Sequence, residues 1–218
     1  MTSRPRPKAA RRRVSPSKSV FINCPFDEGY RPILRAIVFA VISSGYYARC
    51  ALDATDSAEV RVAKIAAMIG ECDWGIHDLS RVEIGVSGLP RFNMAMELGL
   101  HMGARLLGEG RHRRKRALIL DAERHRYQAA LSDIGGQDIE THGNDPEQAI
   151  RCVRNWLSEY RGHGLPLPGA AAMQADYRQF QAEAGALLAP RRLDFKDLTH
   201  SDFIFAVRDW IAARAEPA

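Results

Sequence analysis

Residues 73–80 read DWGIHDLS and residues 91–99 read RFNMAMELG, and these two neighbouring stretches decide the fold. The first is an apolar run that ends on Asp78, which predicts a buried strand closed by a carboxylate. The second predicts a helix that carries Glu97 in its second turn, with Asn93 four residues earlier on the same helical face. Open α/β folds build their sites at the carboxyl ends of parallel strands. We therefore expect two acids and an amide at that edge of a parallel sheet.

The remainder of the chain alternates between the same two kinds of pattern. Strands are expected over residues 19–23, 46–52, 73–78, 116–120 and 138–140, and helices over 30–44, 57–71, 92–103, 123–132 and 145–160. This alternation predicts an α/β, flavodoxin-like fold: a five-stranded parallel sheet flanked by helices, in the order 2-1-3-4-5, with a C-terminal helical pair. The topological switch then lies between strands one and three. The loop after Asn23 should face the loop after Asp78 across one crevice.

Beyond the sheet domain, expected over residues 19–161, the pattern changes. Residues 162–169 contain Pro166 and Pro168 and are interpreted as a linker, and residues 170–218 as a helical appendage. Two amphipathic helices are expected there, over about 170–188 and 200–214, and the cap of the second is Thr199 or Ser201. Such helices cannot bury their apolar stripes alone. They should dock on the sheet domain or on a second copy of the chain, which would make a homo-oligomer.

The net charge of +5 is unevenly distributed. Residues 1–18 hold seven of the 31 basic residues and no acid, so the rest of the chain has 24 basic against 26 acidic residues, a net charge of −2. We expect this segment to be a disordered basic tail. It could be an arm for nucleic acid, but it contains no aromatic residue for base stacking, which favours a solvated leader.

Several functional classes lack support in the sequence. No apolar run approaches the roughly 20 residues of a membrane span, and no apolar segment of a secretory signal follows the basic tail. The four cysteines have no zinc-like spacing with each other or with histidines, which favours reduced thiols in a cytoplasmic protein without a metal. Cys24 lies near the expected site, but no histidine is evidently placed to activate its thiol. Phosphate-binding loops, dinucleotide fingerprints and zinc protease motifs are absent, so no cofactor is expected.

The candidate site residues each have a structural and a functional interpretation. Glu97 is either a boundary residue bonded to a loop or a carboxylate that acts on a sugar, and Asp78 is either a cap or a site acid. Asn93 is either a helix cap or a residue that positions the partner of Glu97. Exposed amides at the helix start, together with Arg91, suit a phosphate. The other candidates for binding substrate are Asn23, Phe26, Asp27, Tyr30 and Arg61.

Three motifs together indicate a family resemblance: FINCPFD at residues 21–27, IHDLS at 76–80 and NMAMELG at 93–99. In this order they resemble the nucleoside 2-deoxyribosyltransferase-like and TIR-like superfamily, over roughly residues 19–160. Met96 stands where the transferases commonly have Phe, and the Trp-Cys pair of many TIR domains is missing before Glu97. The loop at 80–90 also does not resemble the glycine-rich loop of the transferases.

The resemblance implies a catalytic role for Glu97, with Asp78 orienting the sugar or the base. Asn23, Phe26 and Asp27 match the loop that lines the pocket in that superfamily. The expected activity is cleavage of an N-glycosidic bond in NAD or in a nucleoside or nucleotide, with NAD as substrate rather than cofactor, and by analogy a role in bacterial antiphage defence or stress signalling. The alternative expectation is a non-catalytic module that binds a nucleotide and relays a signal.

Overall fold

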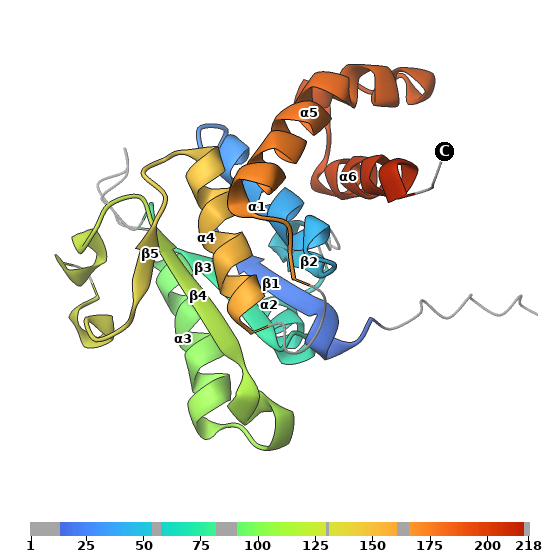
Figure 1. Cartoon of the computed structure of the whole chain (residues 1–218). Helices are drawn as coiled ribbons and strands as arrows, with labels where there is room; N and C mark the ends of the chain where they lie inside the picture. Colours follow the sequence, from blue (N-terminus) through green and yellow to red (C-terminus); the bar gives the residue numbers. More distant parts are fainter. Residues whose placement is uncertain (1–13, 54–57, 82–90, 130, 161–165, 216–218) are drawn as a thin grey trace, which may run out of the picture.

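The structure, a computed structural model, describes residues 14–53, 58–81, 91–129, 131–160 and 166–215. Its centre is a five-stranded, all-parallel sheet in the order β2-β1-β3-β4-β5 (Figure 1). The strands are β1 (Ser19–Asn23), β2 (Tyr47–Cys50), β3 (Trp74–Asp78), β4 (Arg116–Asp121) and β5 (Ile139–Thr141). The predicted flavodoxin-like architecture and strand order are confirmed.

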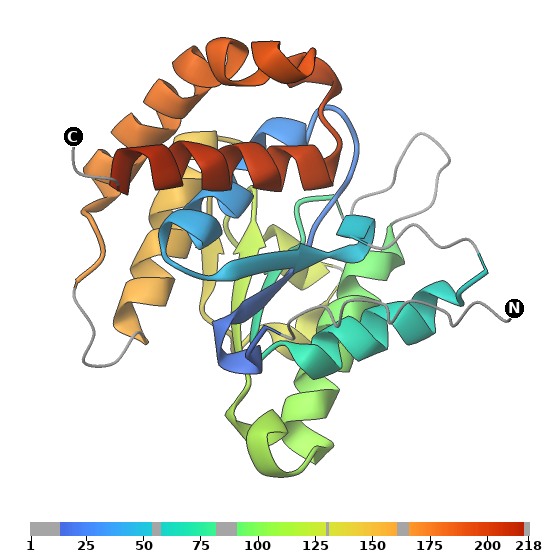
Figure 2. The ribbon, with the colours of Figure 1, turned by 90° about the vertical axis from the view of Figure 1, so that its right-hand side faces the viewer.

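Helices cover both faces of this sheet. α1 (Arg31–Ser43) and α4 (Pro146–Glu159) pack on one face, and α2 (Arg61–Glu71) and α3 (Phe92–Leu107) on the other (Figures 1 and 2). The alternation of side chains along a strand divides β1 between the two layers. Val20 and Ile22 join the core under α1, whereas Phe21 joins the core under α2.

The C-terminal helices α5 (Ala170–Leu188) and α6 (His200–Ala215) form a further layer outside α1 and α4 (Figure 2). Phe180 of α5 is fully buried, and its ring contacts the rings of Phe39, Phe203 and Trp210. Thr199 caps α6, since its Oγ1 accepts a hydrogen bond from the Asp202 amide at 3.2 Å. The appendage therefore docks on the sheet domain of its own chain, and the expected cap at Thr199 is confirmed.

Some expected boundaries were wrong. The helix expected over 123–132 is replaced by two 3-10 turns, Arg126–Ala129 and Ser132–Ile134. His125, just before the first turn, has a φ of 64°, which a continuing right-handed helix does not allow. α2 begins at Arg61 rather than near residue 57.

Other expectations fall partly or wholly outside the described residues. These are the tail up to residue 13, the helix start at Ser57, the loop at 82–90 and the first part of the linker. At the end of the expected tail, Pro16–Lys18 forms a 3-10 turn, and the Trp74 indole donates a hydrogen bond to the Ser17 carbonyl at 3.0 Å. No helix in the described part of the chain is long and apolar enough to cross a bilayer.

Candidate functional site

Asp78 is the centre of a buried hydrogen-bond cluster at the carboxyl edge of the sheet. It is the last residue of β3 and is fully buried. Its Oδ2 accepts hydrogen bonds from the Tyr30 hydroxyl at 2.5 Å and from His142 Nε2 at 2.9 Å, and its Oδ1 accepts one from the Ser80 amide at 2.8 Å. Both carboxylate oxygens are therefore occupied by protein donors.

The surroundings of His142 determine which of its ring nitrogens carries the proton. Nδ1 accepts a hydrogen bond from the Asn144 amide at 3.1 Å, so Nε2 is the protonated nitrogen and donates to Asp78. Burial alone would raise the pKa of the Asp78 carboxyl, but the hydrogen bonds from His142, Ser80 and Tyr30 outweigh it and lower the pKa. Asp78 therefore remains an anion inside the protein.

Asp27, in the loop that follows β1, pairs with two arginines. Its Oδ2 lies 3.1 Å from Arg91 Nη1 and 3.9 Å from Arg81 Nε, and its Oδ1 accepts the Tyr30 amide at 3.1 Å. Arg91 was expected to bind a phosphate together with the amides at the start of α3. In the structure its guanidinium instead pairs with Asp27.

Asn23 joins the end of β1 to the first turn of α3. Its side-chain amide donates a hydrogen bond to the Met94 carbonyl at 2.8 Å and lies 3.1 Å from His77 Nδ1. One strand over, the Gly75 backbone lies so close to the His101 ring that an added Cβ would meet it at 2.7 Å. These contacts place the first turn of α3 at the carboxyl end of β1 and a later turn of the helix against β3 at Gly75.

Glu97 lies in the buried stripe of α3, together with Met94, Leu98 and His101. It is only 5% exposed, and its carboxylate makes no hydrogen bond or ion pair within the described residues. Burial raises the pKa of Glu97 to about 7, although the positive charge of Arg61 opposes the shift. An acid in this position costs free energy, because its carboxylate loses hydration without gaining a partner.

The side chains of Arg61 and Asn93 are exposed at the first turns of α2 and α3. Asn93 and Glu97 were predicted to share one face of α3. In the structure the Asn93 side chain is exposed to solvent, whereas the Glu97 side chain is buried. Arg61 is the charge that acts on Glu97. It is available for an anionic ligand, since it makes no ion pair with another described residue.

The buried Cys24 thiol lies among the acids of this edge. Burial raises its pKa well above the ordinary value, and the negative charges of Asp78, Glu97 and Asp27 add to the shift. The thiol therefore remains protonated, which makes it a poor nucleophile.

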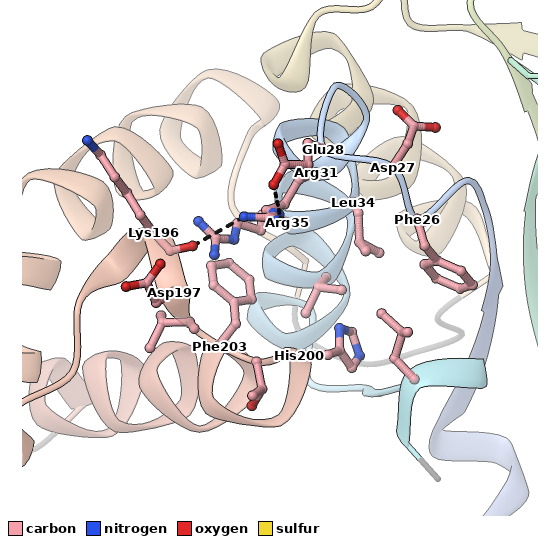
Figure 3. A pocket seen from close by; sticks show the side chains of 14 residues that line it. Phe26, Asp27, Glu28, Arg31, Leu34, Arg35, Lys196, Asp197, His200 and Phe203 are labelled. Atoms are coloured by element: carbon pink, nitrogen blue, oxygen red, sulfur yellow. Dashed lines mark hydrogen bonds and ion pairs between the residues drawn. The ribbon is translucent and has the colours of Figure 1, made fainter. Parts of the chain in front are cut away.

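A cavity of about 420 Å³ lies on the other side of the loop that follows β1 (Figure 3). Phe26 and Asp27 line it from the sheet side, Arg31 and Arg35 from α1, and His200 and Phe203 from α6. Of the predicted site residues, only Phe26 and Asp27 line this cavity. Asp78, Tyr30 and Asn23 are buried and do not line it, and Glu97 lies on the buried face of α3.

The structure adds His142 to the predicted site. It directly follows the last residue of β5. Polar residues at the carboxyl ends of parallel strands are candidates for a site in such folds, and this applies to His142 as it does to Asp78. The expected strand ended at residue 140, one residue short of the observed Thr141, which separated His142 from the strand end. Arg81, the second cation on Asp27, was also missed.

Comparisons of the chain with models of protein families, with curated proteins and with solved structures found no match.

Proposed function

We propose that this chain cleaves the N-glycosidic bond of NAD or of a nucleoside or nucleotide, with Glu97 as the catalytic carboxylate. One observation carries the proposal: Glu97 is buried in the sheet-facing stripe of α3 and has no hydrogen-bond partner among the described residues. A carboxylate held at such a cost is typical of a catalytic acid or nucleophile. The likeness of its motif to deoxyribosyltransferase-like and TIR-like proteins supports the same assignment.

Cleavage of an N-glycosidic bond can be carried out by one carboxylate, Glu97, next to one cation, Arg61. When the bond between C1′ and the base nitrogen breaks, positive charge develops on the ribose and the electron pair leaves with the base. Glu97 stabilises this charge or forms an ester at C1′, and water then adds its oxygen to C1′ and releases the carboxylate. Arg61, exposed beside Glu97, would hold a phosphate of the substrate.

Asp78 has a supporting role in this proposal. Its oxygens already accept hydrogen bonds from Tyr30, His142 and Ser80, and its side chain is fully buried. We assign it the task of holding the loops after β1, β3 and β5 together. Catalysis would then rest on one acid rather than two.

The test is to incubate the pure protein with NAD and, separately, with deoxynucleosides, and to measure release of the free base. Glu97→Gln keeps the size of the side chain and removes its charge, and should lower the rate by about 100-fold or more. Glu109→Gln changes an exposed glutamate and is the matched control, with activity near that of the wild type. Turnover that survives Glu97→Gln unchanged would refute the assignment.

The second candidate function is a nucleotide-binding module without turnover. It is favoured by the state of the other two acids, since Asp78 already accepts three hydrogen bonds from the protein and Asp27 is paired with Arg91 and Arg81. Calorimetric titration with NAD and nucleotides distinguishes the two functions. Tight binding with no product after long incubation would favour the module.

A further inference from the structure

Three side chains that could bind a metal converge where the appendage meets the sheet edge. They are Cys50 at the end of β2, Asp53 in the 3-10 turn Ala51–Asp53, and His200 at the start of α6. His200 Nε2 lies 3.2 Å from Cys50 Sγ and 3.4 Å from Asp53 Oδ1, and one ligand atom from each residue lies within 4.8 Å of the others. The three side chains are mostly screened from solvent, with exposed fractions of 0% for Cys50, 18% for Asp53 and 6% for His200.

Hydrogen bonding alone explains this arrangement poorly. A single ring nitrogen faces both the sulfur and the carboxylate oxygen, whereas one N–H can be directed well at only one acceptor. If Nε2 is instead unprotonated, it can accept a hydrogen bond from the Cys50 thiol, but its lone pair then also faces the Asp53 carboxylate oxygen 3.4 Å away. A cation bound by all three atoms satisfies each of them at once.

We propose that Cys50, Asp53 and His200 form a binding site for a divalent transition metal, with zinc as the ion that best suits the donors. Thiolate, imidazole and carboxylate are the three kinds of ligand that proteins use for zinc. Binding would displace the thiol proton of Cys50 into solvent, so that the ion meets two anionic ligands and one neutral one. Three protein ligands leave a fourth position for water or for a molecule from outside.

Contacts around the three ligands support the assignment. Asp53 Oδ2 accepts the Cys50 amide at 3.1 Å and Arg49 Nε at 3.2 Å, which orients the carboxylate and leaves Oδ1 toward His200. The Leu52 amide donates to Cys50 Sγ at 3.4 Å. Such supporting hydrogen bonds orient metal ligands and tune them.

The site borders the cavity described above, and His200 is common to both (Figure 3). Leu52, from the same turn as Asp53, also lines that cavity. A ligand in the cavity could therefore reach the open position of the metal. The ion would also cross-link α6 to the end of β2, although these two segments are about 150 residues apart in the chain.

Sequence spacing could not predict this site, and the absence of a zinc motif led to the expectation of no metal. Cys50 and Asp53 are near neighbours, but the third ligand comes from the appendage. The fold alone brings His200 beside them. The proposal does not depend on the role of Glu97.

The test is titration of the metal-free full chain with Co²⁺, which reports on cysteine ligands through thiolate-to-cobalt charge-transfer absorption. We expect one equivalent to bind, with a charge-transfer band and visible bands of four-coordinate cobalt, and Zn²⁺ to remove both. Zn²⁺ should also raise the melting temperature. A wild-type chain that shows no charge-transfer band and no thermal shift would overturn the proposal.

Variants assign the ligands. Cys50→Ser should abolish the charge-transfer band, and Asp53→Asn and His200→Gln should weaken Co²⁺ binding by at least about 10-fold. Cys152→Ser removes a buried thiol outside the triad and should leave the titration unchanged. Circular dichroism checks that each variant is folded. If Cys50→Ser does not fold, the other two variants decide, and a band that persists at full strength in both refutes the site.

Discussion

At the scale of single residues, Glu97 is the least expected side chain in the core. It shares the buried stripe of α3 with Met94, Leu98 and His101, where its charged form lacks a hydrogen-bond partner among described residues. The same burial that raises its pKa to about 7 makes the charged form destabilising. A residue that weakens the fold and is nonetheless present is a reasonable site for chemistry.

Glu97 should make stability fall as pH rises. Because the pKa is raised from 4.5 to about 7 by folding, the folded chain binds the proton more tightly between these values. The stabilising contribution is fully present below about pH 4.5 and is lost as pH rises through about 7. We expect Glu97→Gln to remove this dependence and to be more stable than the wild type at pH 8 by about 1–2 kcal/mol, after allowance for solvent screening.

Urea unfolding of both proteins at pH 5 and pH 8 measures the effect, and Glu109→Gln is again the exposed control. The difference between the wild type and Glu97→Gln should grow from pH 5 to pH 8, whereas the control should follow the wild type. An equal difference at both pH values would mean that Glu97 does not titrate in this range.

The site residues also show how far reasoning from sequence reaches. Asn23 and Asp78 were predicted because polar residues that end apolar strands meet at one sheet edge. The partners of Asp78 were harder to predict, because His142, which follows β5, comes 64 residues later in the chain. The ion pair between Arg91 and Asp27 was equally hard to predict. The fold brings these two residues together, and they are not neighbours in the sequence.

At the scale of elements, strong hydrophobic periodicity predicted the strands and long helices well, whereas local helix propensity wrongly predicted a helix over residues 123–132. The strands and the long helices were located to within a few residues because each has a face that must be buried. Residues 123–132 have no comparable apolar stripe. Arg126 is directed instead to Asp121, 2.6 Å away, and to the Ser80 carbonyl, so tertiary contacts replace the expected helix by turns.

The docking of α5 on α1 should depend strongly on Phe180. The ring is fully buried, and its centroid lies 5.7 Å from that of Phe39 in α1 and 5.8 Å from that of Trp210 in α6. Phe180→Ala would leave a cavity among these rings, and we expect it to lower the free energy of unfolding by about 3–5 kcal/mol. Urea denaturation followed by circular dichroism measures the loss.

Phe205→Ala is the matched control on the neighbouring helix. Its ring is 49% exposed, and its described aromatic contact is with the Arg191 guanidinium at 4.6 Å, so it should cost less than about 1 kcal/mol. Equal losses in the two variants would contradict the central position given to Phe180.

At the scale of the whole molecule, the C-terminal helices belong to the same apolar core as the sheet domain. The core under α1 continues without a break into side chains of α4, α5 and α6. The sequence suggested an appendage because residues 162–169 resemble a linker. That pattern describes the covalent connection and not the packing, which is why docking on the chain itself and docking on a second copy were both open.

This continuity predicts that the chain unfolds in one cooperative step. The three tryptophans report on different parts: Trp74 in β3 and Trp156 in α4 form one ring pair, with centroids 5.5 Å apart, and Trp210 lies in α6. Trp210→Phe leaves only the sheet-domain pair as fluorophores. The double variant Trp74→Phe, Trp156→Phe leaves only the α6 reporter.

Within each variant, tryptophan fluorescence and circular dichroism at the same urea concentrations should give coincident transitions, because separating α5 and α6 exposes the apolar outer face of α1 and so destabilises the sheet domain. Comparing the two probes within one variant removes the effect of the substitutions on overall stability. A Trp210 signal that is lost at lower urea than the circular dichroism of the same protein would show that the appendage unfolds on its own. In that case the triad of Cys50, Asp53 and His200 should also open early, and Zn²⁺ should bring the two transitions together.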